Sequence, residues 1–386
     1  MNIELDTHRH PCFNVKVKGE CGRVHLPVAP KCNILCKYCN RKYDCVNESR
    51  PGVTSALLTP EQAVAYLEEV LAAEPRITVA GIAGPGDPFA NPKETMETLL
   101  LVRGRFPDLL LCLATNGLGL PPYIQELTDL QVSHISITVN AVDPEVGQHI
   151  YSWVRDGKKV HRGRAAAEIL LQRQLEGIAG LKARGITVKV NTIVIPNIND
   201  HHVAAVAEKM ATLGVDILNL MPMYPNADTP FAEVPEPSQP DMEQLRQTAE
   251  TFLPQMRHCT RCRADAVGLL DDDQAEHWRG CLSACAAALP SLALDLPYVA
   301  VATREGMLVN LHLGEATSFQ IWEPDGQGFR CREERTAPPP GNGVYRWWAL
   351  AEILYDCRAV LVSAVGDTPP DILIGCPGKG LGGGCE

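Results

Sequence analysis

Residues 28–53 read VAPKCNILCKYCNRKYDCVNESRPGV. Three cysteines in this stretch follow the pattern Cys-x3-Cys-x2-Cys, and they are Cys32, Cys36 and Cys39. Three thiolates on one short loop can bind three irons of a 4Fe-4S cluster and leave the fourth iron open, much as a catalytic zinc site leaves one position for its reactant. The alternative is a helix with three buried cysteines on one face, because the spacings i, i+4 and i+7 share a helical face. Pro30 before the pattern and Tyr38 within it favour the loop and the cluster.

The segments around this loop alternate between strand-like and helix-like patterns. Residues 23–29 alternate apolar and polar side chains, as a half-buried strand does. Thr59-Pro60-Glu61-Gln62 offers an N-cap, a proline at the first helical position and a capping-box partner for a helix to about residue 73. Further strands are predicted at 77–83, 109–114, 133–139, 186–194 and 215–221, with helical patterns between them that include 165–184 and 200–213. Six strands separated by helices predict an α/β fold, a partial (β/α)6 barrel with functional groups at the C-terminal ends of its strands.

The second half of the chain indicates a change of architecture. The proline-rich stretch 222–240 ends the barrel, and a helical pattern at 241–257 leads to Cys259-Thr-Arg-Cys262. Strands at 298–304, 307–313, 318–323 and 359–362, with a helix around 347–354, predict a second, small α/β domain. We therefore expect an N-terminal extension at 1–22, the barrel at 23–240, a C-terminal extension and linker at 241–296, and the small domain at 297–386.

The composition excludes several classes of protein. The 386 residues carry 35 Lys and Arg against 46 Asp and Glu, and this formal net charge of −11 argues against nucleic acid or a membrane surface as a partner. No apolar run approaches the ~18 residues that span a bilayer. The first residues lack the apolar stretch of a secretory signal, so we expect a cytoplasmic protein. In a reducing compartment, the 15 cysteines indicate metal or redox chemistry rather than disulfides.

Residues at several predicted strand ends suit S-adenosylmethionine (SAM), whose amino and carboxylate groups an open iron can chelate and whose sulfonium then yields a 5′-deoxyadenosyl radical. In GPGDP at 84–88, Gly84 and Gly86 allow close backbone approach, and Asp87 can accept a hydrogen bond from the methionine amino group. A plain Gly/Pro turn is the alternative, but its position after the second strand favours the SAM role. Other candidates for SAM contacts are Tyr38, Thr115, Asn116, Thr138, Asn140, Asn191 and Ile193. Ordinary polar strand ends are the alternative for most of these.

Cys-x3-Cys-x-Tyr-Cys after the first strand of a six-strand barrel resembles the radical SAM superfamily, although GPGDP replaces the usual Gly-Gly-Glu-Pro. The wider sequence, with HPC at 10–12, the stretch 28–53 and CRADAVGLL at 262–270, resembles the NifB family of nitrogenase cofactor biosynthesis proteins. This resemblance covers most of residues 8–285. The last domain resembles the ribonuclease H-like NifX/NafY cofactor-carrier domains, and we expect it to be shortened relative to them, since it ends at ILIGCPGKGLGGGCE.

The resemblance implies a radical SAM enzyme of a lyase-like class. Such an enzyme fuses two 4Fe-4S clusters with a SAM-derived carbide and an added sulfide into the eight-iron core precursor, NifB-co, of the nitrogenase iron-molybdenum cofactor. It implies three 4Fe-4S clusters, one that binds SAM and two auxiliary clusters that are the substrate. Expected partners are iron-sulfur scaffold proteins, cofactor carrier and assembly proteins of nitrogenase maturation, and an electron donor such as a ferredoxin.

Six further residues are candidate ligands of the auxiliary clusters, because imidazole can replace thiolate on iron, as in Rieske centres. By family analogy, one group lies nearer the SAM site and contains His10, Cys45 and Cys112. The other group contains Cys12, Cys259 and Cys262. The alternative for Cys112 is a buried strand residue. In NESRPG, Glu48 and Arg50 are candidates to handle a proton and a sulfide or carboxylate, with a solvated charged loop as the alternative.

Other functions remain compatible with the same residues. One is a non-catalytic iron-sulfur scaffold or carrier, and another is a radical SAM enzyme that acts on a small molecule or peptide and uses auxiliary clusters as electron relays. Cys259-x2-Cys262 also resembles half of a zinc ribbon, but Cys281-x3-Cys285 has the wrong spacing for the second half. Cysteines outside the motifs are expected to be structural, and they are Cys21, Cys281, Cys285, Cys331, Cys357, Cys376 and Cys385.

Overall fold

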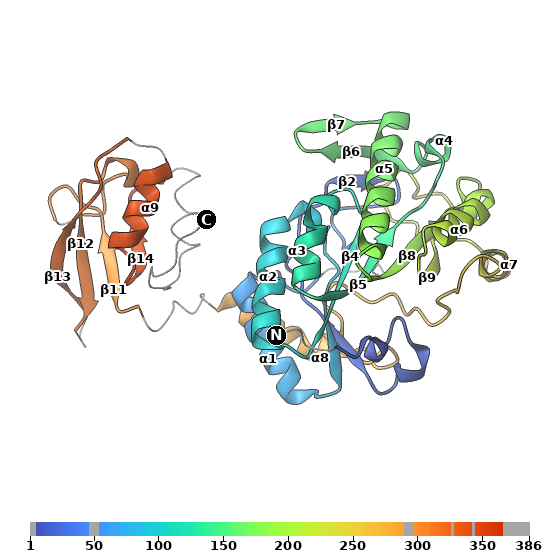
Figure 1. Cartoon of the computed structure of the whole chain (residues 1–386), viewed down its shortest axis with the longest axis horizontal. Helices are drawn as coiled ribbons and strands as arrows, with labels where there is room; N and C mark the ends of the chain where they lie inside the picture. The colour runs from blue at the N-terminus through green and yellow to red at the C-terminus, as the bar shows by residue number, and fades with distance from the viewer. Residues whose placement is uncertain are drawn as a thin grey trace. The chain divides into compact units, whose positions relative to one another are not determined.

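The computed structural model describes residues 5–45, 54–288, 296–306, 308–325, 328–341 and 344–365. The chain divides into two compact units, Met1–Ala288 and Leu289–Glu386, and each is considered by itself (Figure 1). Glu48, Arg50, Cys376 and Cys385 lie outside the described residues. No helix in the described ranges is long and apolar enough to cross a membrane.

A seven-stranded sheet with the order β10-β1-β3-β4-β5-β8-β9 forms the centre of the first unit. Its six parallel strands are β1 (Gly22–His25), β3 (Ile77–Ile82), β4 (Leu110–Thr115), β5 (Val132–Thr138), β8 (Thr187–Val194) and β9 (Ile217–Pro222). The short strand β10 (Val267–Gly268) pairs antiparallel with β1. The parallel strands follow chain order, as expected when each is joined to the next by a helix, and the predicted partial (β/α)6 barrel is confirmed.

Helices follow the strands along the chain (Figure 1). They are α1 (Pro60–Ala73), α2 (Pro92–Arg105), α3 (Ile124–Asp129), α4 (Pro144–Gly147), α5 (Gly163–Lys182), α6 (Val203–Thr212), α7 (Gln239–Glu250) and α8 (Ala275–Ala287). The predicted capping box at the start of α1 is present, because the Thr59 side chain accepts the Gln62 N–H and the Gln62 side chain accepts the Thr59 N–H.

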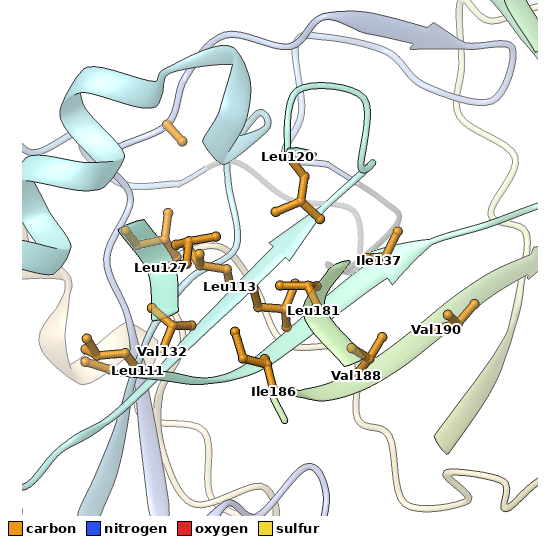
Figure 2. Close-up of a cluster of buried hydrophobic side chains, with 14 of the residues drawn as sticks. Leu111, Leu113, Leu120, Leu127, Val132, Ile137, Leu181, Ile186, Val188 and Val190 are labelled. Atoms are coloured by element: carbon orange, nitrogen blue, oxygen red, sulfur yellow. The ribbon is translucent and has the colours of Figure 1, made fainter. Parts of the chain in front are cut away.

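Alternation along the strands separates a core from a functional face. Leu111, Leu113, Ile137, Val188 and Val190 belong to the main hydrophobic core together with Leu181 of α5 (Figure 2). Successive side chains of a strand point to opposite faces of the sheet. The residues between them therefore lie on the other face, which we call the inner face, and they include Cys112, Ser136 and Lys189.

The cysteine loop is not helical. Residues Ile34–Cys36 form strand β2, which pairs with the hairpin of β6 (Tyr151–Asp156) and β7 (Lys159–His161) in a second sheet. The helical alternative for the three cysteines is therefore wrong. This pairing joins the loop to a segment more than a hundred residues away, which local patterns in the sequence did not indicate.

The second unit contains a four-stranded sheet with the order β13-β12-β11-β14. Its elements are β11 (Tyr298–Val301), β12 (Ser318–Pro324), β13 (Phe329–Thr336), α9 (Val344–Ile353) and β14 (Cys357–Leu361). Leu350 of α9 packs in the core with Phe319 of β12. The strand predicted at 307–313 is wrong for its described residues, because the His312 side chain accepts the Gly314 N–H at 3.0 Å and caps a 3-10 turn at Leu313–Glu315.

Candidate active site

Two adjacent cavities lie on the inner face of the large sheet. The first, called the cysteine-loop cavity, is lined by the predicted site residues Cys32, Cys45, Gly86, Asp87, Thr115, Asn116 and Thr138. The second, called the histidine cavity, is lined by the predicted site residues His10, Cys12, Cys112 and Cys262. Ala83 and Ala114 line both cavities, so the two share a wall. The structure thus gathers predicted site residues from six separated segments of the first unit.

The cysteine loop contains one buried cysteine, Cys36, and two partly buried ones, Cys32 and Cys39. Cys36 is buried at the end of β2, and its carbonyl accepts the Cys39 N–H at 3.0 Å. Burial raises the pKa of the Cys32 thiol to about 12, and the nearby Asp87 carboxylate adds to this shift. Burial also raises the pKa of Cys39, while Arg41 opposes it. The Cys32 and Cys39 thiols therefore need a cation to lose their protons, and a metal ion supplies one.

Within the described ranges, no three His, Cys, Asp or Glu side chains converge closely enough to hold a single metal ion. Thiolates that share one zinc ion lie within roughly 4 Å of each other. The ligands of an iron-sulfur cluster bind different irons and lie farther apart. The Cys-x3-Cys-x2-Cys spacing of the loop is the feature that fits an iron-sulfur cluster.

Gly86 lies where no other residue fits. A Cβ at this position would lie 2.1 Å from the Lys31 carbonyl oxygen and 2.8 Å from the Ala29 carbonyl oxygen. The Gly86 N–H donates to the Ala29 carbonyl at 2.6 Å, and the Asp87 N–H donates to the Lys31 carbonyl at 2.8 Å. The GPGDP segment is thus held directly against the chain that leads into Cys32.

Asp87 joins the GPGDP segment to the loop after β4. Its carboxylate, 3% exposed, accepts the Asn116 N–H at 2.7 Å, the Thr115 hydroxyl at 3.0 Å and the Phe89 N–H at 2.9 Å. Burial raises the pKa of this carboxyl, and these donors oppose the rise. A carboxylate offers about four acceptor sites. Most of the accepting capacity of Asp87 is therefore used inside the chain.

The remaining predicted SAM contacts fall into two groups. Thr138 lines the cysteine-loop cavity, and its hydroxyl is buried with no hydrogen-bond partner among the described residues. Asn140 instead donates to the Tyr38 hydroxyl at 2.8 Å and accepts the Ile193 N–H at 2.9 Å. Asn191 accepts a hydrogen bond from Asn219 at 3.0 Å. Tyr38, Asn140, Ile193 and Asn191 do not line either cavity and form buried polar contacts instead.

His10 is the most informative residue of the histidine cavity. It is 2% exposed, its Nδ1 lies 3.2 Å from the Cys12 N–H, and its Nε2 has no hydrogen-bond partner in the described part of the chain. Its ring lies 4.4 Å from the His134 ring, measured between centroids. Burial lowers the pKa of His10 well below its usual value. The imidazole is therefore neutral at pH 7, which is the form that binds metals.

The cysteines of this cavity come from distant segments. Burial is the main reason that the pKa of Cys12 is raised to about 12; Lys189 and Arg23 oppose the rise, and Cys262 and Cys259 contribute to it. A contact of 3.1 Å between His258 Nε2 and the Pro11 carbonyl joins their two segments. Cys259 lines neither cavity, and Cys45 lines the cysteine-loop cavity, so the residues of each predicted auxiliary group do not share one cavity.

Sequence reasoning missed the charged and aromatic residues of the histidine cavity. Arg23 is 1% exposed and Lys189 is 6% exposed, both on inner-face strand positions. His25 also lines the cavity, and burial together with Arg23 lowers its pKa to about 4. Lys189 Nζ lies 5.6 Å from the centroid of the Phe13 ring. Charged side chains at alternate positions of otherwise apolar strands were the available evidence in the sequence.

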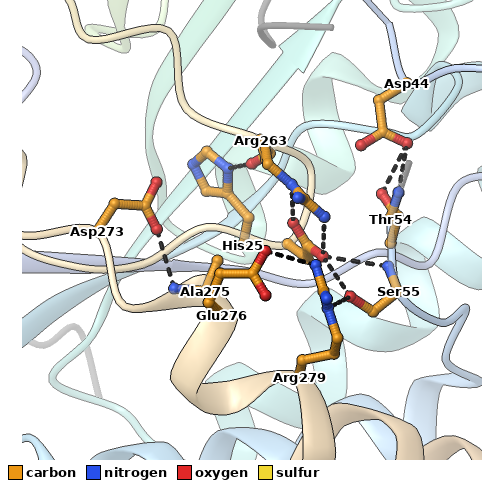
Figure 3. Close-up of polar contacts among 10 residues, drawn as sticks. His25, Asp44, Thr54, Ser55, Arg263, Asp273, Ala275, Glu276 and Arg279 are labelled. Atoms are coloured by element: carbon orange, nitrogen blue, oxygen red, sulfur yellow. Dashed lines mark hydrogen bonds and ion pairs between the residues drawn. The ribbon is translucent and has the colours of Figure 1, made fainter. Parts of the chain in front are cut away.

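A polar network holds the residues on both sides of segment 46–53 (Figure 3). Asp44 accepts the Thr54 N–H at 3.0 Å and its hydroxyl at 2.8 Å. Asp265 accepts the Ser55 N–H at 3.1 Å and pairs with Arg263 at 2.8 Å. Because the Cys45 N–H also donates to the Pro85 carbonyl at 3.0 Å, the flanks of this segment are anchored beside the cysteine-loop cavity.

Comparisons with known proteins add the following. The chain matches the radical SAM superfamily over residues 26–210 and the dinitrogenase iron-molybdenum cofactor family over residues 297–375. The FeMo cofactor biosynthesis protein NifB of Chlorobaculum tepidum is 52% identical over 373 residues, which cover 96% of this chain and 88% of that protein. The NifB of Klebsiella pneumoniae is 41% identical over 393 residues, which cover 93% of this chain and 84% of that protein. Among solved structures, methylornithine synthase (PylB) has a TM-score of 0.40 at 13% identity, covering 73% of this chain and 93% of that one.

Proposed function

This chain belongs to the NifB family of FeMo cofactor biosynthesis proteins, and on that premise we propose that it makes the eight-iron precursor NifB-co. In this proposal it fuses two 4Fe-4S clusters with a SAM-derived carbide and an added sulfide, in a lyase-like reaction. It is a radical SAM enzyme, and that superfamily implies SAM and one 4Fe-4S cluster. The observation that carries the proposal is the wall shared by the cysteine-loop and histidine cavities, because it sets two groups of candidate ligands side by side.

The resident cluster would be held by Cys32, Cys36 and Cys39. When bound, it supplies the electron that cleaves the sulfonium of SAM. Gly86 lets the GPGDP segment pack against the backbone that leads into Cys32, and the Thr138 hydroxyl is available to contact a polar group of SAM. We assign Asp87 a positioning role, since its hydrogen bonds hold Thr115 and Asn116 at the cavity. Tyr38, Asn140, Ile193 and Asn191 form buried polar contacts within the barrel.

The two substrate clusters would be bound by His10, Cys12, Cys45, Cys112, Cys259 and Cys262. The unpartnered Nε2 of His10 supports this, because a buried polar atom without a partner is costly unless a ligand satisfies it. Ligation through Nε2 puts the ring proton on Nδ1. His10 would therefore give up its contact with the Cys12 N–H when it binds iron. Adjacent cavities place substrate near SAM, and such proximity is what a radical transfer needs.

For Glu48 and Arg50 we retain the proposed roles in proton transfer and in binding a sulfide or carboxylate. The anchored flanks of segment 46–53 beside the cysteine-loop cavity support these roles. The match of residues 297–375 to the dinitrogenase iron-molybdenum cofactor family supports cofactor binding by the second unit. Partners would be scaffold, carrier and assembly proteins of nitrogenase maturation and a ferredoxin-like electron donor, in the cytoplasm.

The decisive experiment is anaerobic reconstitution of the full chain with iron and sulfide, followed by SAM and dithionite. The product is then offered to nitrogenase that lacks its cofactor, together with molybdenum and homocitrate. Restored nitrogenase activity is the expected result. Full cluster occupancy without restored activity would overturn the proposed product, and absence of 5′-deoxyadenosine would favour a scaffold or carrier. 5′-Deoxyadenosine without activation would favour an enzyme that acts on another substrate.

A further inference from the structure

We propose that Arg23 is a positioning residue that holds the Cys262 sulfur at the histidine cavity, so that the substrate cluster bound there is retained and more easily reduced. The inference rests on the proposed function, because it takes Cys262 as a cluster ligand. It concerns a residue that no sequence motif indicated. Its basis is the hydrogen bonding of the buried guanidinium.

The two edges of the Arg23 guanidinium have different partners. Nη1 donates to the Gly268 and Leu269 carbonyls at 2.7 and 2.8 Å, which ties β1 to the last residue of β10 and to the residue after it. Nε and Nη2 lie 3.3 and 3.1 Å from Cys262 Sγ. Asp273 Oδ2 lies 3.5 Å from Nη2. The carbonyl contacts are structural, whereas the other edge is directed at a sulfur that lines the cavity.

A buried arginine needs an acceptor of matching charge, because an unpaired buried cation is strongly unfavourable. Asp273 supplies part of that charge from the protein surface side, with 19% of its side chain exposed. A thiolate of Cys262 bound to iron would supply the rest. The planar fork of arginine keeps two donors on one sulfur, which lysine cannot reproduce. This edge of the guanidinium therefore matches a negatively charged sulfur at this position.

Hydrogen bonds to a ligating sulfur have a defined effect on an iron-sulfur cluster. They withdraw negative charge from the sulfur, so they stabilise the reduced form and raise the reduction potential. Residues that orient a metal ligand in this way typically contribute about 10- to 100-fold to metal affinity. Loss of Arg23 should therefore weaken retention of the cluster and lower its potential.

The chain offers a matched control in Arg103 of α2. Its guanidinium donates to the Leu109, Leu130 and Gln131 carbonyls at 3.0, 3.0 and 3.1 Å. None of the hydrogen bonds described for Arg103 involves sulfur. Substitution of Arg103 thus removes a comparable set of carbonyl contacts without touching a proposed ligand.

The test uses full-length, anaerobically reconstituted protein carrying Arg23→Met, Arg23→Lys, Arg103→Met or Arg103→Lys. Iron release to a chelator and the midpoint potentials of the clusters by electron paramagnetic resonance are measured. We expect release from one auxiliary cluster to be about 10- to 100-fold faster in Arg23→Met. The potential of that cluster should fall, with a smaller change in the same direction in Arg23→Lys and none in the Arg103 variants.

Release rates and potentials of both Arg23 variants equal to those of the Arg103 variants would overturn the inference. If circular dichroism shows that Arg23→Met does not fold, Arg23→Lys decides, because it keeps the buried cation and loses the fork. A wild-type chain that holds only the cysteine-loop cluster would overturn this inference and the proposed function together. Wild-type protein that holds auxiliary clusters but fails to activate nitrogenase would overturn only the proposed product, and the Arg23 comparison would still decide this inference.

Discussion

The Asp87 carboxylate offers a sharp test of how the cysteine-loop cavity is held together. Its two oxygens accept different backbone groups, since Oδ1 accepts the Phe89 N–H at 2.9 Å and Oδ2 accepts the Asn116 N–H at 2.7 Å. Asparagine has the same shape but only one accepting oxygen. In Asp87→Asn, one of these buried N–H groups must face an amide NH2.

The expected loss of unfolding free energy follows from this single mismatch. A hydrogen bond to a charged acceptor contributes about 1.5–3 kcal/mol, and an unsatisfied buried donor costs about 1–3 kcal/mol. Removal of the buried negative charge offsets part of this loss of stability, because burial already disfavours the ionised form and raises the pKa of Asp87. We expect the free energy of unfolding to fall by about 2 kcal/mol. If the whole loss is expressed in the SAM site, SAM affinity falls about 30-fold.

Denaturant unfolding of the first unit and calorimetric titration of SAM into reconstituted protein measure the two effects. Asp143→Asn is the matched control, because the Asp143 side chain is exposed and caps α4 with one accepted hydrogen bond from the Glu145 N–H at 2.9 Å. Asparagine serves equally well at an N-cap. Neutral surface changes typically alter stability by up to about 0.5 kcal/mol. The reasoning would be refuted if the unfolding free energies of Asp87→Asn and Asp143→Asn differed by no more than this margin.

Four further predictions concern other parts of the chain. Gly86→Ala should lower the unfolding free energy by about 3 kcal/mol, because backbone oxygens occupy the space that the new Cβ needs. The control is Gly104→Ala, where no atom lies near the new Cβ, and this change should be neutral or stabilising in the same assay. Cys36→Ala should abolish 5′-deoxyadenosine formation, and Cys331→Ala, at an exposed position in the second unit, should not; persistent product in Cys36→Ala would contradict the cluster assignment. Asp265→Ala removes the carboxylate that accepts the Ser55 N–H and pairs with Arg263, so we expect faster proteolysis near residues 46–53 than in Asp271→Ala. Equal rates would count against the anchoring role. Burial lowers the pKa of His202, whose Nε2 accepts the Val142 N–H at 3.2 Å. The contribution of neutral His202 to stability is therefore complete above its usual pKa of 6.5 and is lost as the pH falls below that value. The His202→Gln variant should lose less unfolding free energy than wild type between about pH 7.5 and 5.5, and parallel losses would disprove this.

The barrel could be predicted because its determinants are local. Apolar strand patterns and the capping box at Thr59 each occupy a few consecutive residues. The capping box is found where it was predicted, and the strands lie within a few residues of their predicted ranges, although the first strand ends at His25. The strand β2 could not be predicted, since its structure depends on pairing with β6 more than a hundred residues later. The strand β13 was missed because FRCREERT is charged and exposed at a sheet edge, which gives no apolar alternation.

The same distinction applies to the candidate site. Cys32 and Gly86 belong to compact motifs, so their neighbourhood followed from the sequence. Arg23 and Lys189 belong to no motif, and their roles depend on which strand face meets the N-terminal segment and residues 259–262. Their charge within apolar strands marked them as unusual, but only the assembled sheet shows that both line the same cavity.

The contacts around the histidine cavity also determine when during synthesis it can exist. Arg23 and Cys262 are 239 residues apart in sequence, and Pro11 and His258 are 247 apart. Contacts of such high sequence separation form late, because the intervening chain must first be ordered. A nascent chain from which only the cysteine loop has emerged from the ribosome does not yet have this cavity. The substrate clusters that we propose for this cavity could therefore bind only after nearly the whole first unit has been translated and folded.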